Sequence, residues 1–161
     1  MGLVTNGVLL PKQDAGILNK LTWCRISQGD AREQWSTSFY KSLKTIIKEA
    51  PGVDWAFSYV VSNKPNIPRI KELLAFADEQ GFTHVRLVAD LLCTDQIPME
   101  SLQHALTLTV EKMATPVIFQ DRKQPEKGAN CRVCYLRPVI TPNMRVYACC
   151  GAQYALETPT K

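Results

Sequence analysis

Residues 55–62 of the chain have the sequence WAFSYVVS, a nearly continuous apolar run that follows the helix-ending pair Pro51-Gly52. Aromatic and β-branched residues dominate this run, and its length is that of one β-strand. An apolar run without strict polar–apolar alternation is typical of a strand that is buried on both faces, as strands of parallel sheets are. Residues 55–62 therefore predict the centre of a parallel sheet.

Strand-like and helix-like segments alternate on both sides of this run. A capping box of Asp30 and Glu33 opens the first long helix, Asn66 caps the second, and Pro98 opens the third. This alternation predicts an α/β fold with parallel strands joined by right-handed crossovers. The strands are expected at residues 2–5, 23–27, 55–62, 82–89 and 116–119, and a further helix is expected within residues 7–21.

The length and composition exclude several classes of protein. A chain of 161 residues with 45% apolar and 21% charged residues has the composition of an ordinary globular protein. It is too short for a complete eight-stranded α/β barrel, which takes roughly 250 residues. No apolar run approaches the ~18 residues of a membrane span, and the N-terminus lacks the features of a secretory signal. We therefore expect a cytoplasmic protein without a membrane segment.

Polar residues stand where each expected strand ends. In α/β folds of this kind, ligands bind at the carboxyl ends of the strands. A row of ligand-facing groups and a set of ordinary polar turns both explain the pattern. The strand ends are Thr5-Asn6, Ser27, Ser62-Asn63, Asp90 and Gln120-Asp121.

Residues 120–161 differ from the rest of the chain in charge and in cysteine content. They contain seven Lys or Arg and three Asp or Glu, which accounts for the whole net charge of +4. Four of the six cysteines also lie there. The sequence therefore divides into a neutral body, residues 1–119, and a basic Cys-rich tail, residues 120–161.

A β-hairpin is expected between the cysteines of the tail. Segments 138–141 and 145–149 are strand-like and flank the turn pair Pro142-Asn143. With this pair as the turn, the numbers of opposite residues sum to about 285, so Cys134 faces Gly151. The hairpin thus returns the chain to Cys134 and brings the thiols of the tail together.

Cys131, Cys134, Cys149 and Cys150 are therefore candidate metal ligands. A cytosolic chain keeps its thiols reduced, which favours a metal site over disulfides. Four thiolates suit either tetrahedral zinc or an iron–sulfur cluster. Neighbouring residues on a strand point to opposite faces, so Cys149 and Cys150 do not both ligate one centre unless the strand has ended by Cys150.

The sequence positions of the other chemically active side chains favour structural roles for them. Cys24 lies inside an apolar strand and is expected in the core, and Cys93 follows a strand, where a core position is also favoured. His84 and His104 lack a local metal-ligand partner. The chain has no P-loop and no dinucleotide-binding glycine motif. The sequence identifies no catalytic residue.

Four strand motifs and the cysteine tail resemble one enzyme family. The motifs are TNG at 5–7, WCRIS at 23–27, YVVSN at 59–63 and HVRLV at 84–88. In this order they resemble the later strands of the radical S-adenosylmethionine (radical SAM) barrel. The tail resembles the C-terminal auxiliary-cluster extension called SPASM or Twitch. The resemblance covers nearly the whole chain.

The resemblance implies an incomplete (β/α) radical-SAM-type barrel, which in the complete family is a partial (β/α)6 barrel. In that family a 4Fe-4S cluster, held by C-x-x-x-C-x-x-C, cleaves S-adenosylmethionine reductively. The resulting 5′-deoxyadenosyl radical abstracts hydrogen from a substrate. This sequence has no C-x-x-x-C-x-x-C, and its first strand resembles the family's third. We therefore expect the C-terminal portion of such an enzyme, which does not start radical chemistry without the N-terminal half of the barrel.

The resemblance also assigns ligand contacts. Arg25 and Ser27 match the strand position that contacts the ribose and carboxylate of S-adenosylmethionine, and Ser62 and Asn63 lie near the position that approaches adenosine. The cysteines of the tail match the auxiliary 4Fe-4S cluster, through Cys131, Cys134 and one of Cys149 or Cys150. The implied substrate is an unidentified peptide or small molecule.

A zinc-knuckle α/β module that contacts nucleic acid or protein is the alternative. Basic side chains of the tail would neutralise phosphates, and Tyr135, Tyr147 and Tyr154 would stack on bases. A net charge of +4 over residues 120–161 is small for nucleic-acid binding. It suits a solvated surface around a metal site better.

Overall fold

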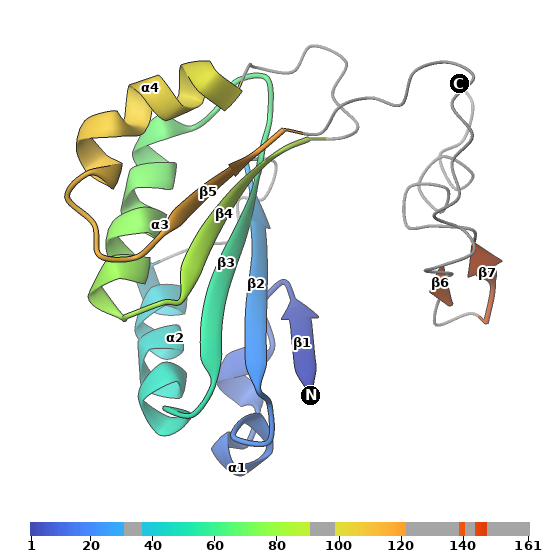
Figure 1. Cartoon of the computed structure of the whole chain (residues 1–161). Coiled ribbons are helices and arrows are strands. Elements are labelled where there is room, and N and C mark those ends of the chain that lie inside the picture. Colours follow the sequence, from blue (N-terminus) through green and yellow to red (C-terminus); the bar gives the residue numbers. More distant parts are fainter. Residues whose placement is uncertain (31–36, 91–98, 122–138, 141–143, 148–161) are drawn as a thin grey trace. The chain divides into compact units, whose positions relative to one another are not determined.

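The computed structural model describes residues 1–30, 37–90, 99–121, 139–140 and 144–147 (Figure 1). The chain divides into two compact units, Met1–Lys123 and Gln124–Lys161. None of the described helices has the length and hydrophobicity needed to cross a lipid bilayer.

A five-stranded, all-parallel sheet forms the first unit, with the strand order β1–β2–β3–β4–β5. The prediction of an α/β fold built on parallel strands is confirmed. The predicted central run forms β3, which pairs with β2 along one edge and with β4 along the other. The strands are β1 (Gly2–Thr5), β2 (Trp23–Gly29), β3 (Asp54–Val61), β4 (His84–Ala89) and β5 (Val117–Gln120).

Helices connect the strands. Asn66 caps its helix as predicted, because its side-chain oxygen accepts a hydrogen bond from the Arg69 amide at 3.1 Å. Gly81 follows the same helix with a φ of +68°, a left-handed conformation that glycine adopts without strain. The helix expected within residues 7–21 is two short pieces instead. The helices are η1 (Leu10–Lys12), α1 (Ala15–Leu18), α2 (Thr37–Glu49), α3 (Ile67–Glu79) and α4 (Met99–Val110).

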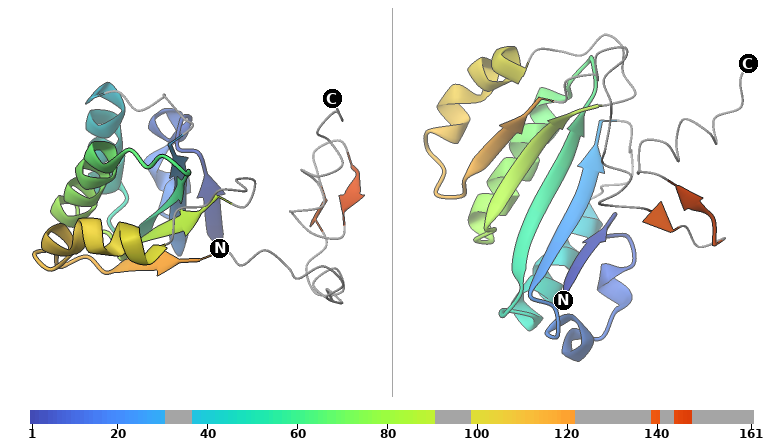
Figure 2. Two further views of the ribbon diagram at one scale, coloured as in Figure 1. Left: turned by 90° about the horizontal axis from the view of Figure 1, so that it is seen from above. Right: turned by 45° about the vertical axis from the view of Figure 1, so that its right-hand side comes forward.

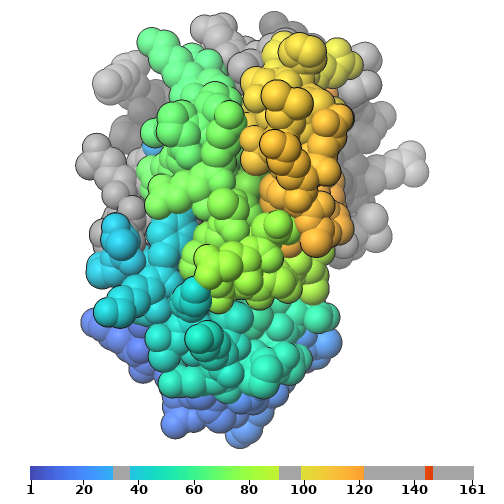
Figure 3. All heavy atoms as spheres, turned by 90° about the vertical axis from the view of Figure 1, so that its left-hand side faces the viewer, coloured from blue at the N-terminus to red at the C-terminus, as the bar shows by residue number. Residues whose placement is uncertain are grey.

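The three long helices cover one face of the sheet. In Figure 2 the helices α2, α3 and α4 lie on the same side of the strands, and Figure 3 looks onto this helical layer. Because the strand order follows the chain order, each crossover moves one strand further in the same direction. A doubly wound sheet reverses its strand order and has helices on both faces. This sheet is therefore singly wound, which is the arrangement of (β/α) barrels.

The hydrophobic core lies between the sheet and its helices. Side chains alternate along each strand, so β3 sends Trp55, Phe57 and Tyr59 to the helical side, where all three are buried. The ring of Phe57 stacks on that of Phe82, with centroids 4.5 Å apart. The indole of Trp55 donates a hydrogen bond to the carbonyl oxygen of Ala50 at 3.3 Å. Tertiary contacts of this kind fix which face of each strand is apolar.

The strand β2 extends two residues beyond its predicted end at Ser27. Gln28 and Gly29 continue the parallel register, opposite Tyr59 and Val60 of β3. The side-chain amide of buried Gln28 donates to the carbonyl oxygen of Asn6 at 3.1 Å, so this polar residue is held inside the sheet. Ser27 therefore lies within the strand rather than at its end.

The described part of the second unit is an antiparallel pair of short strands, β6 (Val139–Ile140) and β7 (Val146–Tyr147). Val139 pairs with Tyr147 and Ile140 with Val146, within one residue of the predicted register. Met144, in the connection, has a φ of +61°, in the left-handed region. The four cysteines that the hairpin is expected to bring together lie outside the described residues.

Apolar side chains gather around β1, the first strand of the sheet order. Met1, Val4, Val8, Leu9 and Ile17 are all exposed. An apolar hollow of about 290 Å³ lies between β1 and the segments η1 and α1. Among the described residues, β1 pairs with β2 alone, so its outer edge presents unpaired backbone groups.

We predict that the chain self-associates through this edge. The double variant Val4→Lys, Leu9→Lys places charge on two side chains that are 51% and 59% exposed, and should lower the association. Sedimentation velocity over a range of concentrations measures the effect. Leu108→Lys is the matched control, because Leu108 is 75% exposed but lies on α4. Equal association of the control and the double variant would contradict the prediction.

Candidate functional site

The face of the sheet opposite the helices carries several polar side chains. Here we call it the open face. It carries the side chains that alternate with those of the core, and most of them are partly exposed. Among the described residues no helix covers this face. Its polar members on the inner strands β2 to β4 and on β5 are Arg25, Ser27, Asp54, Ser58, His84, Arg86 and Gln120.

The open face is electrostatically positive. Partial burial and the nearby charge of Arg86 lower the pKa of Arg25 below its ordinary value. Partial burial, followed by the charges of Arg86 and Arg25, lowers the pKa of His84, so its neutral form is favoured. Among the described residues, no carboxylate forms an ion pair with either arginine. Such a surface attracts carboxylate and phosphate groups.

Hydrogen bonds fix two of these side chains. The guanidinium of Arg86 donates to the side-chain oxygen of Gln120. The hydroxyl of Thr83 donates to the carbonyl oxygen of Trp55 at 3.0 Å and lies 3.3 Å from Nδ1 of His84. Nδ1 of His84 is therefore in contact with Thr83. A neutral imidazole has one donor and one acceptor nitrogen.

The residues predicted to contact S-adenosylmethionine lie at different positions along the strand direction. Arg25 and Ser27 share the open face of β2, about 7 Å apart along the strand. Ser62 and Asn63 follow β3 at its carboxyl end. Arg25 is in register with Ala56, and Ser62 lies six residues further on, about 20 Å along the sheet. The structure thus places Ser27 between Arg25 and the other two residues.

The predicted metal ligands Cys131, Cys134, Cys149 and Cys150 lie outside the described residues, as does Cys93. Within the described part of the chain, no three His, Cys, Asp or Glu side chains are grouped closely enough to hold a metal ion. Cys24 is fully buried, and this burial raises the pKa of its thiol to about 11. The prediction that Cys24 belongs to the core is confirmed.

Asp30 connects three segments at the carboxyl end of the sheet. Its carboxylate accepts hydrogen bonds from the Tyr59 hydroxyl at 2.6 Å, from the Ser62 amide at 2.8 Å and from the Asn66 amide at 3.0 Å. Burial and the bond to Asp30 raise the pKa of Tyr59 above its ordinary value. The sequence suggested a capping box of Asp30 with Glu33, and Glu33 lies outside the described residues. The bonds to β3 and to the start of α3 were not predicted, because nothing in the local sequence indicates them.

No protein-family model, no curated protein and no solved structure matches this chain.

Replacing Asp30 by Ala should lower the free energy of unfolding by about 2 kcal/mol, because hydrogen bonds to a charged group are strong and two of the donors are backbone amides. Urea unfolding followed by circular dichroism measures the change. Glu111→Ala, at an exposed acidic residue, is the control and should stay within about 0.5 kcal/mol of the wild type. Equal stability of the two variants would show that Asp30 does not connect the segments.

The lowered pKa of His84 also predicts a dependence of stability on pH. The unfolded chain binds a proton at the ordinary histidine pKa of about 6.5, whereas the folded chain binds it only at lower pH. His84 therefore contributes its full stability at a pH above the ordinary histidine pKa of about 6.5, and this contribution is lost as the pH falls below that value. Arg25, Arg86 and Asp54 are the charged groups on the same face.

The test compares wild type with His84→Asn, which does not titrate. Unfolding by urea at about pH 7 and about pH 5 should show that the wild type loses more stability over this interval than the variant does. An equal loss in the two proteins would mean that His84 has the same pKa in both states.

Proposed function

We propose that the chain is the later part of a radical SAM barrel with a metal-binding tail. The observation that supports this most is the singly wound, all-parallel sheet with its helices on one face and its polar residues on the other. In a (β/α) barrel the face without helices is the interior, and ligands are held next to it at the carboxyl ends of the strands. The motifs at 5–7, 23–27, 59–63 and 84–88 lie on or directly after β1 to β4, in the family's order.

The donor set of the open face fits S-adenosylmethionine, which supplies a radical when a reduced cluster cleaves it. Ser27 provides a hydroxyl for the ribose, and Ser62 and Asn63 provide polar groups at the carboxyl end of the sheet, near the adenosine. Of these residues Arg25 lies furthest from the carboxyl end of the sheet, and its guanidinium suits a carboxylate. The role of these residues is to bind and orient the ligand.

The tail is proposed to hold an auxiliary 4Fe-4S cluster through Cys131, Cys134 and one of Cys149 or Cys150. Thiolates are the usual ligands of such clusters, and zinc is the other metal that this donor set accepts. Because this sequence lacks C-x-x-x-C-x-x-C, the proposal includes a second polypeptide segment that carries the primary cluster. Radical hydrogen abstraction from a peptide or small molecule is then the reaction of the complete barrel.

Metal analysis after anaerobic purification tests this proposal. We expect iron and sulfide in about equal amounts, with broad visible absorbance. The double variant Cys131→Ser, Cys134→Ser should lose the metal, since it removes half of the thiols of the tail. Cys93→Ser is the control, because this cysteine is isolated in sequence, and it should retain the iron.

Stoichiometric zinc without colour would overturn the radical SAM proposal. It would favour the alternative of a zinc-knuckle module that binds nucleic acid or protein. Retention of iron in the Cys131→Ser, Cys134→Ser variant would show that the cluster is held elsewhere.

A further inference from the structure

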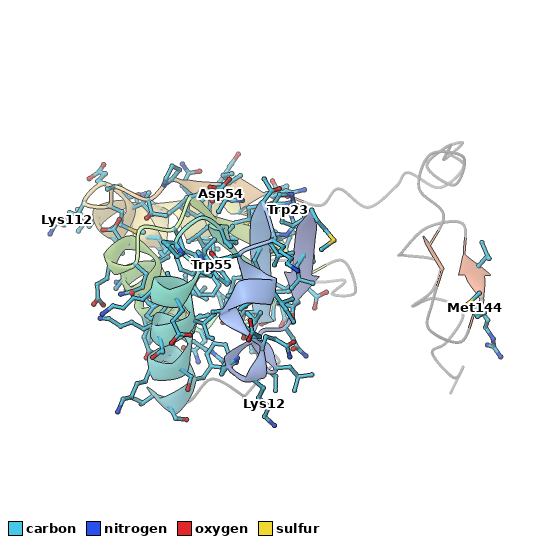
Figure 4. The ribbon with its side chains drawn as sticks, turned by 90° about the horizontal axis from the view of Figure 1, so that it is seen from below. Lys12, Trp23, Asp54, Trp55, Lys112 and Met144 are labelled. Atoms are coloured by element: carbon cyan, nitrogen blue, oxygen red, sulfur yellow. The ribbon has the colours of Figure 1, made fainter. Side chains whose placement is uncertain are left out.

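A pocket that shares Arg25 with the proposed S-adenosylmethionine contacts lies at the amino-terminal half of the open face. It has a volume of about 420 Å³, which is within the range of small-molecule sites. Figure 4 shows Trp23 and Asp54 on the side of the sheet away from α2, whereas Trp55 points toward the helices. This pocket is formed at the opposite end of β3 from Ser62 and Asn63. Its lining residues are Trp23, Arg25, Asp54, Ala56, Thr83 and His84.

The pocket contains opposite charges that are not paired with each other. Arg25 and Asp54 both line it, yet they form no ion pair, and the pKa of Arg25 is lowered by burial and by Arg86. Asp54 begins β3 opposite Trp23, and Arg25 lies two residues further along β2. A small ligand that carries both charges can therefore bind between them, with an anionic group on Arg25 and a cationic group on Asp54.

His84 adds an acceptor to the same pocket. Its Nδ1 is in contact with Thr83, as described above, so Nε2 is the ring nitrogen that remains for a ligand, and it accepts a bond when the imidazole proton is on Nδ1. The imidazole of His84 and the side-chain oxygens of Asp54 together suit an ammonium group, which has three donors and no acceptor. Arg25 suits the two oxygens of a carboxylate.

Trp23 provides an aromatic wall. Its indole lies over Gly2, where a Cβ atom would come within 2.0 Å of the ring, so glycine at this position makes room for it. The guanidinium of Arg25 lies 5.9 Å from the centre of the ring, a cation–π distance. Ala56, between Arg25 and His84 in the register, has a side chain small enough to leave the floor open. Trp23 remains 41% exposed and so has ring surface left for a ligand.

We propose that this pocket binds a free α-amino acid with an apolar or aromatic side chain. Its carboxylate pairs with Arg25, its ammonium group with Asp54 and Nε2 of His84, and its side chain packs against Trp23. The binding itself does not depend on the radical SAM proposal. Only the further statement that this amino acid is the substrate rests on it. In that case Arg25 pairs with the carboxylate of the amino acid, and Ser27, Ser62 and Asn63 remain for S-adenosylmethionine.

The experiment is a calorimetric titration of the full chain with L-phenylalanine, after a thermal-shift screen of the twenty common amino acids. Phenylalanine amide lacks the carboxylate and N-acetylphenylalanine lacks the ammonium group. Each analogue should bind at least about tenfold more weakly than phenylalanine. The same titrations are made on the protein with and without its metal, so that failure of the cluster proposal leaves this result readable.

Variants locate the ligand. Arg25→Gln and Asp54→Asn should each weaken binding at least about tenfold, because each leaves one charge of the ligand unpaired. Lys112→Gln and Glu111→Gln remove the same charges from exposed positions next to α4 and should bind as the wild type does. Circular dichroism establishes that each variant is folded. If Arg25→Gln does not fold, Asp54→Asn, at an exposed residue, carries the test.

Four results would overturn the proposal. The first is absence of binding by all twenty amino acids. The second is equal binding of phenylalanine and its two analogues, and the third is equal binding of inorganic phosphate, which would make the pocket a simple anion site. The fourth is competitive displacement of phenylalanine by S-adenosylmethionine, which would assign the pocket to the proposed cofactor.

Discussion

Parallel pairing of β3 with β2 on one edge and with β4 on the other is the constraint on which the rest of the structure depends. Parallel neighbours need a crossover, and here each long crossover is a helix on the same face. The apolar side chains Trp55, Phe57 and Tyr59 must then face those helices. Since a slip of one residue would turn them to the other side, burial fixes the register. That register in turn places Arg25, Ala56 and His84 in one row of the open face.

Two aspartates hold the ends of this sheet together. Asp30 joins the end of β2 to the segment between β3 and α3, through bonds to the amides of Ser62 and Asn66. Asp78, on α3, accepts bonds from the amides of Ala114 and Thr115 at 2.9 and 2.8 Å, before β5. Both carboxylates bind backbone groups that no strand or helix satisfies. Hydrogen bonds thus fix the connections between the strands that carry the polar residues of the open face. A precise binding site requires such support.

The sequence predicts what depends on local pattern, and fails where distant contacts decide. The five strands and the cap at Asn66 follow from hydrophobic pattern and capping chemistry, and the structure has them. The extra length of β2 does not, because Gly29-Asp30 looks like a turn until Gly29 is seen opposite Val60. The cluster of His84, Arg25 and Arg86 was missed for a similar reason. Its members are far apart in the chain, and only the strand order makes them neighbours. The cysteine tail stays a prediction from spacing.

The contact between Thr83 and His84 links the chemistry of the open face to the backbone. The carbonyl oxygen of Trp55 accepts bonds from both the amide and the hydroxyl of Thr83, at 2.9 and 3.0 Å, so one peptide group of β3 holds that hydroxyl in place. The position of the hydroxyl beside Nδ1 of His84 therefore depends on the pairing of β3 with β4. If the two strands separated here, the hydroxyl would rotate away and the imidazole would lose a neighbour of fixed position. The surroundings of His84 thus differ according to whether the first residues of β4 are paired with β3.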